Sequence, residues 1–533
     1  MKVKLNGKEM EAGDMTILEL ARKNGIRIPT LCYKKEFGPE GRCRVCVVEA
    51  DGKLVTSCNT RLKDGMSILT DSERVQKSRN IAKRLIGMRE KRKEHVVSDE
   101  PIVYNPSRCV LCKACVKACG NMQTVSSIGE AGRGIKTKIE NPFDYHALNS
   151  PCTFCGQCIA FCDRNAITER DDTAKVVEAL RDKSRHVIVQ AAPSIRASLG
   201  EMFGMAGGLV TGKMASALRK LGFDKVFDTD FAADLTTVEE THEFLERLEK
   251  KRLPHLTSCC PAWIRFAEYY YPELLGKIST TKSPHMMLGS LVKTYYAKKQ
   301  GIKPKDIMVV SIMPCTAKKF EITRKETFIS GMPNVDAVLT TRELGNLMKS
   351  SGIDLAKMKD GSFDEPLGIS SGGAAIYGVT GGVAENVLRS ASFMLGKKPV
   401  AVDFQAVRGL DGIKEAEIVL AGKKISVAAA SGLGNIRKLL ESMKSGKRYD
   451  IMELMACPGG CINGGGQPFS EDHDILKKRA DALFRQDMKL DFRIANENLA
   501  VKEIYGFLGK PLGAKAEKIL HTGFSKRRIE IGK

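Results

Sequence analysis

The pattern of apolar and polar positions changes at about residue 175. Beyond that point, short apolar runs of the kind that form buried strands alternate with helix-like segments. This alternation is typical of a parallel β-sheet, in which functional residues follow the carboxyl ends of the strands. The strand-like runs are residues 187–190, 225–228, 307–311, 337–339, 426–430 and 451–454.

The chain before residue 175 has a different pattern. Residues 3–5 are strand-like and residues 16–21 are helix-like, so residues 1–75 are predicted to form a small β-rich unit. A charged helix is expected over about residues 72–94. A chain of 533 residues exceeds what one hydrophobic core supports, so several domains are expected.

Composition narrows the class of protein. A hydrophobic content of 43% and a charged content of 28% are typical of a soluble globular protein. No apolar run approaches the roughly 18 residues that span a bilayer, and the first residues lack the apolar region of a signal peptide. We therefore expect a cytoplasmic protein with no membrane span, in which cysteines are rarely disulfides.

The formal net charge of +22 raises the question of nucleic-acid binding. We expect no nucleic-acid partner, because lysines and arginines are spread along the chain and cluster-bound thiolates would offset part of the charge. The dense basic run lies within residues 78–93. This run is either one solvated face of a helix or a docking face for an acidic electron carrier or partner subunit.

The stretch from Met455 to Gln467 contains Cys457, Cys461 and mostly glycine. Glycine fits where the backbone approaches something bulky or adopts a positive φ. The preceding residues 449–455 are predicted to form a buried strand, so these thiols would lie at a strand end, where α/β sheets bind ligands. The alternative is a flexible turn with two unrelated cysteines.

The first four of the 17 cysteines follow the spacing C-x10-C-x2-C-x11-C, at Cys32, Cys43, Cys46 and Cys58. Four thiolates with one close pair suit a 2Fe–2S cluster. A four-cysteine zinc site usually has two close pairs, so zinc is the less favoured alternative.

Two further runs share the spacing C-x2-C-x2-C-x3-C, which is that of bacterial ferredoxins with two 4Fe–4S clusters. In that pattern the fourth cysteine of each run binds the other cluster. We therefore pair the first three cysteines of each run with the last of the other. One set is Cys109, Cys112, Cys115 and Cys162, and the other is Cys152, Cys155, Cys158 and Cys119.

The remaining five cysteines occur in three stretches of the β/α region. Residues 257–263 contain Cys259 and Cys260, residues 313–321 contain Cys315, and the glycine-rich stretch contains Cys457 and Cys461. These stretches resemble the three signature motifs of the FeFe hydrogenases. Residues 28–33 and 41–49 likewise resemble the plant-type ferredoxin domain at the start of these enzymes and of complex I large subunits.

The resemblance implies a multidomain α/β plus α+β protein. It would comprise a β-grasp 2Fe–2S ferredoxin domain (1–75), a basic helical linker (76–100), a two-cluster 4Fe–4S ferredoxin domain (101–172), a two-lobed α/β catalytic domain (175–470) and a helical tail (471–533). The family's segment with one histidine and three cysteines for a further cluster is absent, and His95 is expected to be a surface residue.

The resemblance also implies a cofactor, the H-cluster. Its 4Fe–4S cube would be held by Cys260, Cys315, Cys457 and Cys461, and Cys461 would also bridge to a di-iron subsite that carries CO, cyanide and a dithiolate amine. Cys259 is left over beside a ligand. A spare thiol is usually inert, but the resemblance makes it the proton donor and acceptor of the site.

In the family a proton path leads from this thiol to the surface. The matching residues are Glu240, Ser279, Glu243 and Arg247. Glu240, Glu243 and Arg247 share one face of the expected helix, which by itself would suit a salt-bridged surface helix.

Further residues are expected at the cofactor. Lys318, Pro193 and Ser194 match cyanide-contacting positions, and Met313 and Met455 would wall the site or be plain core. Two positions depart from the family, with His285 where glutamine is usual and Tyr377 where phenylalanine is frequent. Our hypothesis is that they shift catalytic bias or inhibitor sensitivity.

The function implied is reversible oxidation of H2 to protons. Electrons would pass through the 4Fe–4S and 2Fe–2S clusters to an acidic ferredoxin or to flavin- and NAD(P)-binding partner subunits, and maturation proteins would insert the di-iron subsite. The alternatives are an H2 sensor or an iron–sulfur electron-transfer or scaffold protein with little turnover.

Overall fold

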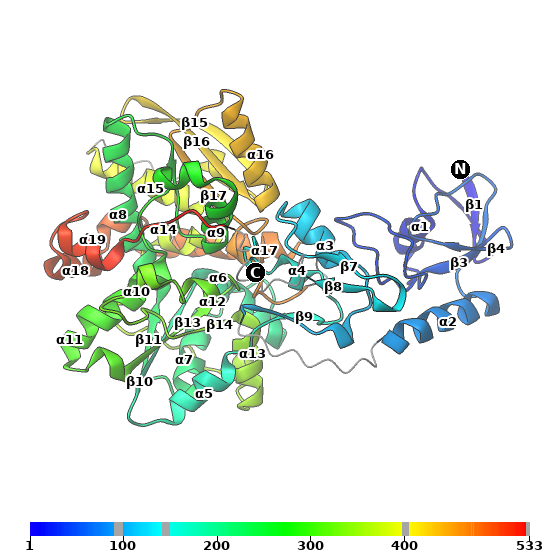
Figure 1. Ribbon diagram of the computed structural model, residues 1–533, viewed down its shortest axis with the longest axis horizontal. Coiled ribbons are helices and arrows are strands. Elements are labelled where there is room, and N and C mark those ends of the chain that lie inside the picture. The colour runs from blue at the N-terminus through cyan, green and yellow to red at the C-terminus, as the bar shows by residue number, and fades with distance from the viewer. Residues whose placement is uncertain (90–99, 141–149, 397–403, 471, 473, 529–533) are drawn as a thin grey trace.

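The computed structural model describes residues 1–89, 100–140, 150–396, 404–470, 472 and 474–528. His95 and the end of the expected basic run therefore lie outside the described residues. Figure 1 shows a small N-terminal unit at one end of the molecule, a cysteine-rich middle part and a larger C-terminal body. Within the described residues, no helix is both long and apolar enough to cross a bilayer.

The N-terminal unit is built on one mixed sheet with the strand order β2-β1-β5-β3-β4. Helix α1 (Ile17–Lys23) begins at Thr16, whose hydroxyl and Glu19 form a capping box, and buries Ile17, Leu18 and Leu20. The strands are β1 (Lys2–Leu5), β2 (Lys8–Glu11), β3 (Val47–Ala50), β4 (Lys53–Thr56) and β5 (Ser67–Leu69).

Helix α2 (Glu73–Arg89) follows this unit, and one side of the helix packs against it. The Arg79 guanidinium donates to the carbonyl oxygens of Val47 and Thr70. On the outer side, Ile81 and Leu85 are exposed among lysines and arginines. The helix expected over 72–94 is thus present in its described part.

The cysteine-rich part contains an internal repeat. Helix α3 (Ala114–Lys117) and helix α4 (Gln157–Ala160) each lie within a cysteine run and contain its third cysteine, Cys115 or Cys158. In each run the backbone has positive φ at the two matching positions, Leu111 and Lys113 in the first and Phe154 and Gly156 in the second. Two short sheets complete this part, made of β6 (Ile102–Tyr104) with β9 (Ile167–Glu169) and β7 (Gly129–Ala131) with β8 (Lys138–Glu140).

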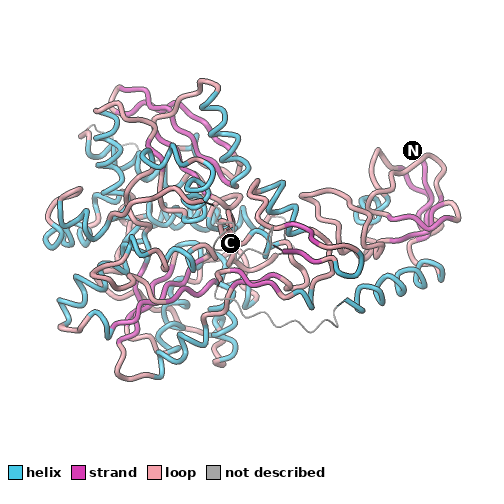
Figure 2. The backbone as a smooth tube through the Cα atoms, in the orientation of Figure 1, coloured by secondary structure: helices cyan, strands magenta, loops and turns pink. Residues whose placement is uncertain are grey.

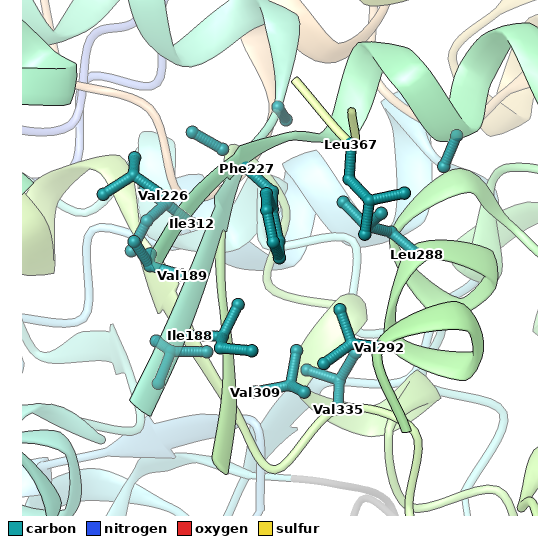
Figure 3. Packing of buried hydrophobic residues seen from close by; sticks show 14 of the residues in the cluster. Ile188, Val189, Val226, Phe227, Leu288, Val292, Val309, Ile312, Val335 and Leu367 are labelled. Atoms are coloured by element: carbon teal, nitrogen blue, oxygen red, sulfur yellow. The ribbon is translucent and has the colours of Figure 1, made fainter. Parts of the chain in front are cut away.

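The C-terminal body has two sheets, and Figure 2 shows their strands as two separate groups. The first sheet has the order β11-β10-β13-β14 and is entirely parallel. Figure 3 shows its core, with Phe227 near Leu288 of the helix that covers it. The strands are β10 (His186–Ala191), β11 (Lys225–Asp228), β13 (Ile307–Met313) and β14 (Ala337–Thr340).

The second sheet differs from the parallel arrangement that the β/α alternation predicts. Its order is β12-β17-β16-β15, and β15 (Ile413–Leu420) pairs antiparallel with β16 (Lys423–Ser431). The sequence analysis missed β15, because the charged residues Lys414, Glu415 and Glu417 interrupt the apolar positions of this edge strand. The inner strands are β12 (His255–Leu256) and β17 (Ile451–Met455).

Helix α8 (Thr229–Glu249) is buried over most of its length, because α10 (Pro284–Leu291) and α15 (Gly382–Met394) pack on it. The tail helices α17 (Ile475–Lys489), α18 (Leu499–Leu508) and α19 (Ala514–Leu520) lie against this body, and α19 contacts α10. The other helices are α5 (Thr173–Arg181), α6 (Pro193–Ser198), α7 (Thr211–Leu221), α9 (Pro261–Tyr270), α11 (Ala297–Gln300), α12 (Lys318–Glu321), α13 (Thr341–Ser350), α14 (Gly372–Ala375) and α16 (Leu433–Lys444).

Candidate active site and cluster-binding sites

A cavity lies where strands of both sheets end. Its walls come from the residues that follow β10 and β13 of the first sheet and β12 and β17 of the second. The carboxyl ends of parallel strands are where open α/β sheets bind ligands. Five thiols line this cavity, those of Cys259, Cys260, Cys315, Cys457 and Cys461.

The glycine-rich loop after β17 packs so closely that side chains would not fit. A Cβ on Gly464 would lie 2.2 Å from the carbonyl oxygen of Pro314. A Cβ on Gly460, where φ is +98°, would lie 2.7 Å from the backbone nitrogen of Thr380. The glycines therefore let the loop bring Cys457 and Cys461 against the Cys315 loop, and the flexible-turn alternative is wrong.

We expect Gly464→Ala to lower the iron and sulfide content of the purified protein and to destabilise it by about 1–3 kcal/mol, because the new methyl group overpacks backbone. Iron and sulfide analysis and thermal unfolding measure both effects. Gly506→Ala is the matched control, since Gly506 lies in α18 with no atom within 4 Å of its added Cβ. Equal cluster content in the two variants would contradict the prediction.

The cavity offers a donor set that suits an iron–sulfur cofactor. Burial raises the pKa of the Cys315 thiol to about 12, so these thiols bind as thiolates only when a metal cluster compensates the charge. The hydroxyl of Ser194 lines the cavity and is buried with no hydrogen-bond partner in the described part of the chain. A buried hydroxyl without a partner can donate a hydrogen bond to a bound ligand.

Lys318 brings a positive charge to the cavity. Its Nζ lies 2.8 Å from Glu321 Oε2 and 3.0 Å from Ser283 Oγ. Burial works against the ammonium, but the Glu321 carboxylate outweighs it and raises the pKa of Lys318. Lys318 is therefore a charged donor beside the thiols. Pro193, Met313 and Met455 also line the cavity.

The residues expected on the proton path converge around α8. Glu240 is completely buried, Glu243 accepts a hydrogen bond of 2.6 Å from Ser279 Oγ, and Arg247 pairs with Glu243. The surface-helix alternative is wrong for Glu240. Burial, followed by the charge of Glu243, raises the pKa of Glu240 to about 8.

Cys259 lies at the inner end of this arrangement. Burial raises the pKa of the Cys259 thiol, and Glu240 is the charged group that adds most to this effect. Arg247 lies at the outer end, one turn before the exposed Lys250. A row of polar side chains therefore extends from Cys259 at the cavity to Arg247 near the surface.

His285 and Tyr377, the two departures from the family, both line the cavity. His285 Nε2 lies 2.8 Å from Glu321 Oε2, the oxygen that also binds Lys318. The Tyr377 hydroxyl lies 2.7 Å from Thr237 Oγ1, and burial raises the pKa of Tyr377. His285 therefore contacts the carboxylate that binds Lys318, and Tyr377 contacts Thr237 of α8.

We expect His285→Gln to leave the shape of the pH profile of hydrogen uptake unchanged between about pH 6 and 8. Burial, with help from the Lys318 charge, lowers the pKa of His285 to about 4, so the ring is neutral throughout that range. Hydrogen uptake across pH in the wild type and the variant tests this. A limb near neutral pH that disappears in the variant would contradict it.

The cysteines of the middle part form two groups. Cys109, Cys112, Cys115 and Cys162 line one small cavity. Cys119 lies within electrostatic reach of Cys152, Cys155 and Cys158. Burial, followed by the charges of Cys119 and Cys152, raises the pKa of Cys155 to about 12. This is the crossed pairing that the two runs predict, and the binding role of each cysteine stays a prediction.

The second of these groups touches the main cavity. Cys457 Sγ lies 4.0 Å from the carbonyl oxygen of Cys155. A Cβ on Gly465 would lie 2.6 Å from the Cα of Gly156, so two glycines permit the contact. The two cysteine sites are therefore neighbours.

The N-terminal cysteines lie together in pairs. The hydrogen bond between Cys32 and Cys43 lowers the pKa of Cys43, and that between Cys58 and Cys46 lowers the pKa of Cys46. Leu31, next to Cys32, lines the cavity of the Cys109 group. The Phe37 and Phe161 rings lie 4.7 Å apart, and Lys34 pairs with Asp163 at 2.5 Å. The N-terminal unit thus contacts the middle part beside this cavity.

Three residues of the site escaped the sequence reading. Glu321 holds Lys318 and His285, Thr281 Oγ1 bonds both Ser258 and Ser279 at 2.9 Å, and His255 Nε2 lies 3.3 Å from Glu240 Oε1. Glu321 is in the same motif as Lys318 and could have been found from its spacing. Nothing in the sequence links His255 to Glu240.

Comparison with known proteins agrees with this geometry. Four family models match: a 2Fe-2S iron-sulfur cluster binding domain over residues 1–73, a 4Fe-4S dicluster domain over 88–167, the C-terminal domain of the iron only hydrogenase large subunit over 185–465, and the iron hydrogenase small subunit over 473–527.

Whole relatives match over nearly the full chain. The NADP-reducing hydrogenase subunit HndD of Solidesulfovibrio fructosivorans is 42% identical, and iron hydrogenase 1 of Clostridium pasteurianum is 39% identical over 96% of this chain and 97% of that protein. The HndD match covers 96% of both chains. A solved variant of FeFe-hydrogenase HydA1 from Chlamydomonas reinhardtii is 40% identical, with a TM-score of 0.61, and covers 67% of this chain and 99% of that one.

These matches confirm the predicted cofactors, which are a 2Fe–2S cluster, 4Fe–4S clusters and the H-cluster. They also decide between iron and zinc at the N-terminal cysteines. The chain is an α/β multidomain oxidoreductase that acts on H2, and it belongs to the iron-only hydrogenase family.

Proposed function

We propose that the protein catalyses the reversible conversion of H2 into two protons and two electrons, and that it exchanges the electrons with an NAD(P)-linked partner. The observation that carries the proposal is the five-thiol cavity with buried acids on one side and a cysteine site on the other. The H-cluster, when bound, supplies the metal chemistry that cleaves and forms H2. The protein supplies ligands, proton transfer and an electron outlet.

The four thiolates of Cys260, Cys315, Cys457 and Cys461 would hold the cofactor. Ser194, the backbone at Pro193 and Lys318 would bind its polar ligands. The unpartnered Ser194 hydroxyl and the charged Lys318 support this role. Met313 and Met455 would exclude water from the cavity, as both are almost completely buried.

Cys259 would take up and release the proton at the cavity. The proton would then pass along Glu240, Ser279 and Glu243 to Arg247. The hydrogen bond of Ser279 to Glu243 and the ion pair of Glu243 with Arg247 support the outer half of this route. Because the pKa of Glu240 is about 8, this residue carries a proton at neutral pH and can both give and accept one.

Electrons would leave through the site of Cys152, Cys155, Cys158 and Cys119, then through that of Cys109, Cys112, Cys115 and Cys162, and finally through Cys32, Cys43, Cys46 and Cys58. The contacts of Cys457 with Cys155, and of Leu31 with the Cys109 group, support this order. A β-grasp fold for the first unit, supported by its five-stranded sheet and α1, would present the last cluster to a partner.

The partner is expected to be an NAD(P)-linked subunit. The relative HndD belongs to an NADP-reducing hydrogenase, and the match extends along the whole chain. An acidic ferredoxin would suit the basic outer side of α2 as well. Maturation proteins would be needed for the di-iron part. The domain boundaries given above remain proposals.

Anaerobic infrared spectroscopy of the matured protein in the CO and cyanide region, with hydrogen uptake measured on the same sample, tests the proposal. Bands together with turnover are expected. Bands without turnover would favour a sensor, and no bands beside a working maturation control would favour an electron-transfer or scaffold protein. NADP reduction by the protein with and without a flavin-containing partner subunit then tests the electron acceptor.

A further inference from the structure

His255 is a buried histidine that faces the acid at the start of the proton path. It lies at the start of β12, which pairs with β17 through Ile451. Its side chain is completely buried. The centroids of its ring and of the Phe244 ring lie 5.8 Å apart in an edge-to-face arrangement. Its Nε2 lies 3.3 Å from Oε1 of Glu240. The histidine is therefore held by packing in contact with Glu240.

Each member of this pair has one polar atom left over. His255 Nδ1 and Glu240 Oε2 are buried, and neither has a hydrogen-bond partner among the described residues. A buried N–H without a partner is rarer in proteins than a buried acceptor without one. This favours the tautomer in which Nε2 carries the hydrogen and donates to Glu240, while Nδ1 is the unpaired acceptor.

Few other groups influence the pair. Burial lowers the pKa of His255 to about 4, so the ring stays neutral near neutral pH. The titratable and charged groups around the two residues come from α8 itself, the Cys259 loop, the segment after α14 and the end of the tail. They are Glu243, Arg247, Cys259, Tyr377 and His521.

We propose that His255 is a positioning residue of the proton path: its Nε2–H donates to Oε1 of Glu240 and leaves Oε2 as the oxygen that takes up and releases the proton. The inference rests on the proposed function, in which Glu240 passes protons to and from Cys259. When Glu240 loses its proton, the same N–H stabilises the carboxylate. His255 itself neither gains nor loses a proton.

The test uses the cluster-loaded enzyme and removes only the donor. His255→Leu removes the N–H donor. His255→Asn keeps a polar side chain, but its amide is too short to reach Glu240, so the donor to Glu240 is lost there as well. His255→Gln keeps an N–H close to the Nε2 position. His242→Leu is the matched control, since His242 lies on α8 and its one hydrogen bond within the described residues is to Val238 O of the same helix, 2.8 Å away.

The first readout is the pH profile of hydrogen turnover. Loss of a donor to the carboxylate disfavours its charged form, so the limb assigned to Glu240 should move up by about one to two pH units in the Leu and Asn variants. The Gln variant and the His242 control should keep the limb near its wild-type position. A limb that stays in place, or one that moves to lower pH because Nε2 is an acceptor, overturns the proposal.

The second readout needs no turnover. The infrared band of the protonated Glu240 carboxyl group is the band that Glu240→Gln removes, and it should shift to higher wavenumber in His255→Leu because Oε1 loses its hydrogen bond. An unshifted band overturns the inference. The wild-type sample distinguishes failure of this inference from failure of the proposed function. If it has neither CO and cyanide bands nor turnover, the proposed function is wrong, whatever the position of the carboxyl band.

Discussion

Cys259→Ala is expected to lower hydrogen turnover by about 10²–10⁴-fold in both directions, which is the usual contribution of a positioned acid–base group. The substitution leaves the four cysteines that are expected to hold the cofactor, so cluster content should not change. Cys259 lines the cavity beside Cys260, and Glu240 is the charged group that adds most to the raised pKa of its thiol. Without the thiol, no other group of the proposed path reaches the cavity wall.

Hydrogen uptake and evolution, together with the CO and cyanide bands of the same sample, measure this effect. Cys260→Ala is the useful comparison, because it should lower cluster content as well as turnover. Intact bands with lost turnover in Cys259→Ala would separate proton transfer from cofactor binding. Turnover within a factor of about three of the wild type would show that protons reach the cavity by another route.

Glu240→Gln is expected to have the second-largest effect, a loss of about 10²–10³-fold in turnover near pH 7, because an amide occupies the same space but cannot exchange a proton. Glu240 is completely buried. It is also the acid between Cys259 and the Glu243–Arg247 pair. Turnover across pH at constant ionic strength measures the loss.

The pH dependence follows from the raised pKa of Glu240, from an ordinary value of 4.5 to about 8. Below about pH 8 the residue carries its proton, and at pH 9 only about one tenth of the molecules keep it. The limb of the wild-type profile near pH 8 should therefore vanish in Glu240→Gln. A variant that retains that limb would show that another group titrates there.

Glu239→Gln is the matched control for this experiment. Glu239 is the neighbouring residue on α8 and is also completely buried, but it bonds the tail, through the Tyr505 hydroxyl at 2.7 Å and the Leu512 backbone at 2.8 Å. Its loss should weaken the attachment of the tail and lower the thermal midpoint. The turnover per loaded cluster should stay near that of the wild type.

The contact between the N-terminal unit and the middle part gives the N-terminal cysteine site a neighbour although the family's histidine- and cysteine-containing segment is absent. The absent histidine and cysteines would leave the 2Fe–2S site without a neighbour if that unit stood apart. Instead, Leu31 reaches the cavity of the Cys109 group, and Phe37 meets Phe161. The two cysteine sites therefore lie beside each other without that segment.

The sequence by itself determined the features that depend on local chain geometry. The two C-x2-C-x2-C-x3-C runs predicted iron–sulfur sites, because three thiols spaced three residues apart on one short segment can all reach the same small cluster. The apolar runs from residue 187 onward predicted six strands at their observed positions, since a buried parallel strand is apolar on both faces. The glycine-rich loop after β17 marked the site for the same local reason.

The tertiary structure alone decided which distant segments meet. Helix α8 reads as a charged surface helix, but α10 and α15 cover it and bury Glu240. The contacts of His255 with Glu240 and of Cys457 with Cys155 join residues that no spacing connects. Such contacts arise from the packing of whole elements, which fixes burial and pKa, whereas residue spacing reports only what the chain can reach within a few turns.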